Sequence, residues 1–192
     1  MRRYRRAEIP ERGILVWMEI TGQDALIVVD VQNDFCPGGA LAVPDGDAVI
    51  PAIQAIAGRF QHILLTQDWH PAGHCSFASS HSGLKPCDLD PVSGERLWPD
   101  HCVQGTQGAE IRAGLQLPRA EMLLRKGFRR EMDSYSAFFE NDRATPTGLA
   151  GYGRERGFRR FFFAGLAYDF CVGFSALDAR RCGFEAVVIR DA

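Results

Sequence analysis

The chain has 192 residues with a formal net charge of −2, of which 46% are hydrophobic and 24% charged. This is the balance of an ordinary globular protein. A chain of this length suits one domain that can bury a core without the help of disulfides or a structural metal. Because the charge is slightly negative and no basic stripe recurs, the composition argues against a nucleic-acid partner. No apolar run approaches the roughly 18 residues of a membrane span, so we expect no membrane partner either.

The first 22 residues differ from the rest of the chain. They begin with the basic run MRRYRR, and the apolar stretch at 14–18 has neither the length nor the cleavage site of a signal peptide. We expect residues 1–22 to be a loose N-terminal extension or the result of a start codon assigned too early, with Met18 as the favoured start. Without a secretory signal we expect a cytoplasmic protein whose six cysteines are free thiols, because the cytosol keeps thiols reduced.

Five apolar segments run on without alternation, which predicts strands buried on both faces of a sheet. They cover residues 25–30, 62–67, 121–124, 160–165 and 186–189. Between them, helical spacing of apolar residues predicts helices at 48–60, 149–156 and 171–181. Strands that alternate with helices predict an α/β fold, a doubly wound and mostly parallel sheet with helices on both faces, within a single domain at 23–192.

Four ionisable residues follow the expected strands. Asp30 ends the first, Asp68 follows the second and Lys126 follows the third. Cys171 opens the helix after the fourth. Because ligands of open parallel sheets bind outside the carboxyl ends of the strands, we expect these residues to meet at one edge.

Three of these residues have both an ordinary and a chemical interpretation. Cys171 could be a packed core thiol, but a helix N-terminus lowers a thiol pKa and so favours a nucleophile. Lys126 could be a surface lysine, yet the chain has 22 Lys plus Arg and the sole other lysine is Lys85. Lysine, unlike arginine, can shift its pKa. Asp30 could cap a helix, or it could be the general base that takes the thiol proton.

Histidines cluster in a long loop that is rich in Pro, Gly, Ser and His, at residues 68–102. Asp68, His70 and His74 lie within seven residues of one another, and His101 lies at the end of the loop. A carboxylate with histidines suits one divalent metal ion, either Zn²⁺, Fe²⁺ or Mn²⁺. The alternative is a solvated loop, although irregular loops of this length are usually functional or disordered.

Five segments of the chain resemble the nicotinamidase/pyrazinamidase family of the isochorismatase-like cysteine hydrolases. The segments are VDVQNDFCPGGALAVPDGD, TQDWHPAGHCSFAS, LWPDHCVQGTQGAE, RKGFRREMDSYSAFF and GLAYDFCV. The resemblance extends from about residue 24 to residue 192. It implies an isochorismatase-like α/β/α fold and an amidohydrolase that converts nicotinamide to nicotinic acid and ammonia in NAD salvage. Pyrazinamide is a second implied substrate, and the resemblance leaves open whether the protein is a homo-oligomer.

The resemblance also implies roles for individual residues. The implied catalytic triad is Asp30, Lys126 and Cys171. The implied metal ligands are Asp68, His70 and His101, with His74 as a fourth ligand in some relatives. The implied pyridine pocket is lined by Phe35, Trp98 and Tyr135. A cis peptide between Leu166 and Ala167 is implied as well, in a turn that aims the backbone N–H groups of Ala167 and Cys171 at the substrate oxygen.

Two features depart from the family pattern. Tyr168 stands in the oxyanion turn where the family usually has Thr. The sequence stops after the last expected strand, whereas relatives continue with about one helix and one strand, so we expect a domain without these elements. Three alternatives remain: another amidohydrolase of the superfamily, such as one that acts on N-carbamoyl compounds, an inactive fragment, or a metal- or redox-binding module. Isochorismatase itself lacks the cysteine nucleophile.

Overall fold

The computed structural model describes residues 18–192. Residues 1–17, most of the expected N-terminal extension, lie outside this part of the chain. Residues 18–22 of that extension contact the rest of the protein. Ile20 packs against an apolar cluster beside the sheet, and the backbone N–H of Thr21 donates to the Asp24 carboxylate at 2.7 Å.

Five parallel strands form one sheet, as the sequence predicts. Their order across the sheet is β3-β2-β1-β4-β5. The strands are β1 (Asp24–Val29), β2 (His62–Asp68), β3 (Met122–Lys126), β4 (Arg160–Gly165) and β5 (Glu185–Val188). Each lies within two residues of its predicted range, and the doubly wound α/β class is confirmed.

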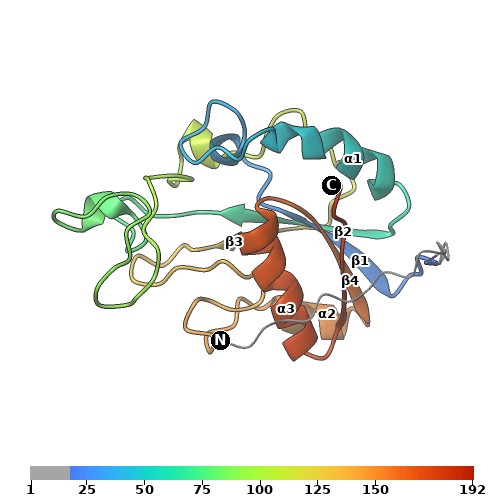
Figure 1. The fold of residues 1–192 in the computed structure, drawn as a ribbon. Helices are drawn as coiled ribbons and strands as arrows, with labels where there is room; N and C mark the ends of the chain where they lie inside the picture. The colour runs from blue at the N-terminus through green and yellow to red at the C-terminus, as the bar shows by residue number, and fades with distance from the viewer. Residues whose placement is uncertain (1–17) are drawn as a thin grey trace, which may run out of the picture.

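Helices cover both faces of this sheet (Figure 1). Helix α1 (Val49–Ala57) lies on one face, and α2 (Leu149–Glu155) and α3 (Gly173–Arg181) lie on the other. Short single turns occupy several loops. These are η1 (Asn33–Phe35), η2 (Gly46–Ala48), η3 (Ala78–Ser80), η4 (Gln107–Ala109) and the π turn η5 (Tyr168–Val172).

Strand β1 shows why the sheet is apolar on both faces. Successive side chains of a strand point to opposite faces. Leu26 and Val28 therefore join the cluster that contains Ile53 of α1, while Ile27 joins the cluster that contains Ala179 of α3. All six residues of β1 are buried. A central strand between two helical layers needs this uninterrupted apolar run.

The expectation of burial on both faces is wrong for the two edge strands. In β3, half-buried and exposed residues alternate before the buried Lys126, and Leu123 is 46% exposed. In β5, Glu185 is exposed and the other three residues are half-buried. Each of these strands is at an edge of the sheet and pairs with one neighbouring strand, so part of its surface stays open to solvent.

The expected helix at 171–181 is also shorter than predicted. Its regular part is α3, which begins at Gly173, and Cys171 lies in the preceding π turn η5. Phe170 within that turn has non-helical dihedral angles (φ −114°, ψ −105°). The polypeptide therefore kinks immediately before Cys171.

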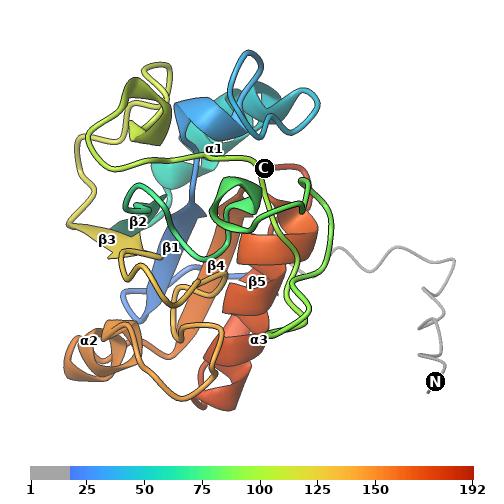
Figure 2. The ribbon, with the colours of Figure 1, turned by 90° about the vertical axis from the view of Figure 1, so that its left-hand side faces the viewer.

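The long connections gather beyond the carboxyl ends of the strands. In Figure 1 the loops after β2, drawn in green and yellow, extend to the left of its arrowhead. Figure 2 views the molecule from that side, and the same loops lie in front of the sheet. Within residues 18–192, no helix combines the length and apolar character needed to cross a membrane.

Candidate active site

Two charged residues face each other because their strands pair in register. Asp68 is the last residue of β2, Lys126 is the last residue of β3, and the two are partners in the parallel ladder. Lys126 Nζ lies 2.5 Å from Asp68 Oδ1. Asp30 follows β1 directly and adopts a left-handed conformation (φ 47°). The carboxyl edge of the sheet thus brings the three together, as the strand-end argument predicts.

Lys126 is the centre of this cluster and is 1% exposed. Its Nζ donates to Asp68 Oδ1, to the carbonyl of Ser134 at 3.0 Å and to Cys171 Sγ at 3.3 Å. It also lies 2.8 Å from Asp30 Oδ2. Burial disfavours the ammonium, but the adjacent carboxylates of Asp30 and Asp68 outweigh it and raise the pKa of Lys126 well above its usual value. Lys126 is therefore a permanent cation between two carboxylates and a thiol.

The pKa of Cys171 is raised, in contrast to the lowered value expected at a helix N-terminus. Burial is the largest cause, and the carboxylates of Asp30 and Asp68 add to it, while Lys126 opposes them. Burial likewise raises the pKa of Asp30, against the opposing effect of Lys126. The resting thiol is thus protonated, and a carboxylate of raised pKa lies beside it. This arrangement suits proton transfer during attack rather than a preformed thiolate.

Asp68, His70 and His101 form a second cluster on the other side of the Asp68 carboxylate. His70 Nε2 and His101 Nε2 lie 3.6 Å and 4.0 Å from Asp68 Oδ2. Each ring donates its Nδ1–H to a backbone carbonyl, His70 to Gly127 at 2.9 Å and His101 to Pro99 at 2.8 Å. Both Nε2 atoms are thereby oriented toward the carboxylate, as in metal-binding histidines, whose other ring nitrogen commonly donates to a backbone carbonyl.

This cluster fits a divalent metal ion. The three ligand atoms lie within 4.8 Å of one another, and all three residues are buried. Burial lowers the pKa of His101 to about 4, so its imidazole is neutral and can donate a lone pair. The pKa of Asp68 is held below its usual range by Lys126 and His70, in spite of burial, so it is a carboxylate. One anionic oxygen with two imidazole nitrogens suits Zn²⁺, Fe²⁺ or Mn²⁺.

His74, the implied fourth ligand, belongs to a different group. It clusters with His70 and Asp133. Its Nδ1 bonds to Ser76 Oγ at 2.7 Å, and its Nε2 bonds to the Met132 carbonyl at 3.2 Å. Its ring packs against His70 with centroids 4.3 Å apart. Both ring nitrogens of His74 thus have protein partners, and its ring packs against the ring of His70.

A cavity of about 250 Å³ opens onto both clusters. Cys171 and the three residues of the metal cluster line it, whereas Asp30 and Lys126 lie behind them, fully buried. The other expected pocket residues that line it are Phe35, Trp98, Tyr135 and Ala167. Such a volume is below the range of about 300–1,000 Å³ typical of drug-sized ligands, so it suits a single ring.

The turn to which the resemblance assigns the oxyanion has the predicted cis peptide between Leu166 and Ala167. Leu166 itself does not line the cavity but packs into an apolar cluster with Phe35. Tyr168, the departure from the family pattern, is 59% exposed. Its phenol therefore lies toward solvent and does not fill the turn.

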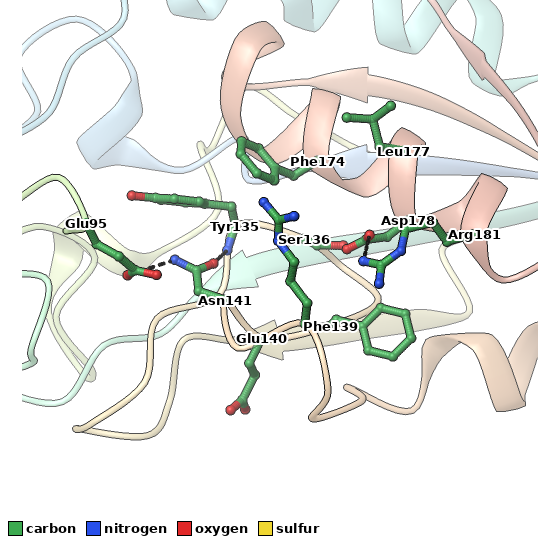
Figure 3. Close-up of a pocket in the computed structure, with 11 residues that line it drawn as sticks. Glu95, Tyr135, Ser136, Phe139, Glu140, Asn141, Phe174, Leu177, Asp178 and Arg181 are labelled. Atoms are coloured by element: carbon green, nitrogen blue, oxygen red, sulfur yellow. Dashed lines mark hydrogen bonds and ion pairs between the residues drawn. The ribbon is translucent and has the colours of Figure 1, made fainter. Parts of the chain in front are cut away.

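Tyr135 separates this cavity from a second one of about 390 Å³, which is drawn in Figure 3. Asn141 bridges the two sides of the second cavity, since its Oδ1 accepts from the Tyr135 N–H at 3.0 Å and its Nδ2 donates to Glu95 at 3.1 Å. Tyr135 OH in turn accepts from Trp98 Nε1 at 3.0 Å. Two loops that are distant in sequence are thus tied together at the wall of the smaller cavity.

The structure adds three residues that the sequence analysis missed. Thr66 Oγ1 donates to Asp30 Oδ1 at 2.6 Å and accepts from the Asp30 N–H at 3.1 Å. Phe170 lines the small cavity against Trp98, with ring centroids 5.1 Å apart. Asp133 lines it beside His70. Of the three, Thr66 alone could have been found from the sequence, because it precedes Asp68 by two residues in a strand and so points to the same face of the sheet.

Comparisons with known proteins agree with this architecture. The isochorismatase domain model matches residues 24–192. The nicotinamidase of Acinetobacter baylyi is 54% identical over 170 residues, which cover 88% of this chain and 79% of that protein. Two solved structures are also similar. The L. infantum protein in complex with nicotinate has a TM-score of 0.80 and 43% identity, over 91% of this chain and 82% of that one. The Pyrococcus horikoshii pyrazinamidase in complex with zinc has a TM-score of 0.70 and 39% identity, over 88% and 85%.

The fold and the cavity define a parallel α/β protein whose ligand site lies at the carboxyl edge of its sheet. The domain match and the identity to known members make the assignment more specific. The chain belongs to the isochorismatase domain family and, within it, to the nicotinamidase/pyrazinamidase family, as its motifs predict.

Proposed function

We propose that this protein is a nicotinamidase, a metal-containing cysteine amidohydrolase that converts nicotinamide to nicotinic acid and ammonia. The observation that carries the proposal is one cavity of about 250 Å³ that contacts both the Cys171 thiol and the Asp68–His70–His101 cluster. A ring amide can present its carboxamide to the first and its ring nitrogen to the second. The name of the Acinetobacter relative and the nicotinate complex of the L. infantum protein support this substrate.

Asp68, His70 and His101 would hold the metal ion. The zinc complex of the Pyrococcus relative favours Zn²⁺, and Fe²⁺ and Mn²⁺ suit the same ligands. When bound, the ion would supply a coordination site for the pyridine nitrogen and so orient the ring. Phe35, Trp98 and Tyr135 would pack against the ring and exclude water.

Acylation begins with transfer of the Cys171 S–H proton to Asp30. The sulfur attacks the carboxamide carbon, and the positive charge of Lys126 stabilises the developing thiolate. The N–H groups of Ala167 and Cys171 would stabilise the oxyanion, and one such donor is typically worth about 2.7–4 kcal/mol. The C–N bond then breaks, Asp30 returns its proton to the nitrogen, and ammonia leaves with the acyl group bound to sulfur as a thioester.

Deacylation uses the same groups with water in place of the thiol. Asp30 takes a proton from a water molecule that enters the place of ammonia, and the hydroxide adds to the thioester carbon. The C–S bond breaks, nicotinic acid is released, and Asp30 returns the proton to Cys171. Pyrazinamide would follow the same course, since it keeps a ring nitrogen in the same position relative to its carboxamide.

The test compares nicotinamide with benzamide, which has the same carboxamide on a ring without nitrogen. We expect the zinc-loaded protein to release ammonia from nicotinamide and from pyrazinamide, and to act far more slowly on benzamide. A chelator should abolish this preference, and added zinc should restore it. Equal rates on nicotinamide and benzamide would contradict the role of the metal, and no ammonia from either would contradict the proposed activity.

A further inference from the structure

Gly127 lies between the two clusters of the candidate site. It directly follows Lys126 at the end of β3, and its carbonyl oxygen accepts the Nδ1–H of His70 at 2.9 Å. This bond requires a hydrogen on Nδ1 of His70, so Nε2, the atom that faces Asp68, is the ring nitrogen that can bind a metal ion. The residue thus sets the tautomer of a metal ligand through its backbone alone.

The absence of a side chain at Gly127 is equally important. A Cβ at this position would lie 2.4 Å from His70 Cε1 and 2.7 Å from its Nδ1, closer than non-bonded atoms can approach. The ring cannot retreat, because it is 1% exposed and has the His74 ring at 4.3 Å and the Phe77 ring at 5.6 Å. The backbone of Gly127 is also left-handed (φ +64°), a conformation that favours glycine.

We propose that Gly127 is a positioning residue for the metal site, which holds the His70 ring so that Nε2 points at the metal position. This inference rests on the metal site of the proposed function. Substitution of Gly127 would push the His70 ring away from the Gly127 carbonyl and weaken metal binding. Lys126 would keep its own contacts with Asp30 and Cys171, because the atoms nearest the Gly127 Cβ position belong to His70 and Asp133.

The experiment measures zinc affinity of the purified protein by competition with a chromophoric chelator, for the wild type and two alanine variants. Gly127→Ala is the test, and Gly157→Ala is the matched control. Gly157 has a similar left-handed backbone (φ +74°), but no atom lies within 4 Å of its Cβ position. We expect Gly127→Ala to lower zinc affinity about 10–100-fold, the usual cost of losing a group that hydrogen-bonds a metal ligand, and Gly157→Ala to leave it unchanged.

A second measurement separates contact with His70 from a general loss of fold. We expect Gly127→Ala to lower the melting temperature of the zinc-free protein more than Gly157→Ala does. In a His70→Ala background the ring is absent, so Gly127→Ala should lower the melting temperature no more than Gly157→Ala does, because the larger effect comes from direct contact with His70. The measurement remains decisive if Gly127→Ala alone does not fold, since the double variant must then fold and be less stable than His70→Ala by no more than Gly157→Ala is less stable than the wild type.

Wild-type zinc affinity in Gly127→Ala would overturn the inference and leave the proposed function intact. An equal loss in Gly157→Ala, or an excess destabilisation that persists without the His70 ring, would also overturn it. A wild-type protein that binds no zinc would instead contradict the metal site itself, and the inference would fall with it.

Discussion

Asp68 touches both halves of the candidate site. Its Oδ1 accepts from Lys126, which also contacts Cys171, while its Oδ2 faces the Nε2 atoms of His70 and His101. One carboxylate therefore sets the spacing between the nucleophile and the metal cluster. A substrate that bridges them must carry its metal-binding atom and its reacting carbonyl at a fixed separation, which small ring amides provide.

Thr66 is the residue that holds the proposed base. Its hydroxyl makes two hydrogen bonds to Asp30, one to the carboxylate and one to the backbone. A hydrogen bond to a charged group is worth about 1.5–3 kcal/mol. We expect Thr66→Val, which keeps the shape but lacks the hydroxyl, to lower kcat about 10-fold or more with little change in KM.

Thr66→Ser is the matched control, because it keeps the hydroxyl and should retain most of the activity. Zinc content should be the same in both variants. A Thr66→Val protein with the wild-type kcat, or a Thr66→Ser protein as impaired as Thr66→Val, would rule out this role.

The residue types of the site could be predicted because parallel strands bring their ends to one edge. The protonation states could not. Cys171 has a raised rather than a lowered pKa because the segments that cover it exclude water. That covering comes from residues far apart in sequence, which no local pattern describes. The role of Gly127 was hidden for a similar reason, since it depends on where the His70 ring packs.

At the scale of elements, the register of β2 with β3 places Asp68 opposite Lys126. A salt bridge stabilises the pairing of β1 with β4. Arg160, the first residue of β4, donates from Nε and Nη2 to the carboxylate of Asp24, the first residue of β1, both at 2.8 Å. The Asp24 side chain is 3% exposed. This bidentate pair holds the amino ends of the two central strands level with each other.

Asp24→Asn should therefore lower stability at neutral pH by about 1 kcal/mol, as measured by chemical denaturation. Burial raises the pKa of Asp24, but hydrogen bonds from Arg160 and Thr21 outweigh it and leave the pKa below its usual value. The carboxylate thus stabilises the fold fully above the unfolded pKa of about 3.9, and this contribution is lost as the pH falls through the lower folded pKa.

The difference between wild type and Asp24→Asn should accordingly shrink below about pH 4. Glu185→Gln is the control, since Glu185 lies 3.9 Å from Arg160 with its side chain 66% exposed, and its loss should change little. A difference for Asp24→Asn that stays constant down to pH 2 would show that the carboxylate charge is not what stabilises the strands.

The strand positions and the order of elements followed from sequence because each central strand is an uninterrupted apolar run. The exposure of the edge strands could not be predicted, because Leu123 and its apolar neighbours are of the same residue types as those in a central strand. The number of neighbours a strand acquires is a property of the whole sheet, which explains why β3 and β5 are more exposed than expected. The kink at Phe170 could not be predicted either, because the sequence around Cys171 is compatible with the start of a regular helix.

At the scale of the whole molecule, the metal cluster joins the two ends of the long loop after β2, with Asp68 and His70 at its start and His101 at its end. A ligand that binds the folded state alone stabilises it by about 2.7 kcal/mol at 100 times its dissociation constant. For a domain of this size, each kcal/mol raises the melting temperature by about 2–4 °C. We therefore expect zinc at 100 times its dissociation constant to raise the melting temperature by about 5–10 °C.

His101→Ala should lose this thermal shift, and His81→Ala should keep it. His81 lies in the same loop but outside the metal cluster, where its Nε2 bonds to the Cys75 carbonyl. A shift that survives in His101→Ala would place the stabilising zinc somewhere else on the protein.

The central claim is that Cys171 is the nucleophile of an amidohydrolase, and ammonia release from nicotinamide by two zinc-loaded cysteine variants tests it most directly. Cys171 lines the small cavity, whereas Cys182 is the C-cap of α3, away from that cavity. Both variants should bind zinc as the wild type does. The account predicts that Cys171→Ala releases no ammonia above the uncatalysed background while Cys182→Ala retains the wild-type rate. Turnover by Cys171→Ala would contradict it.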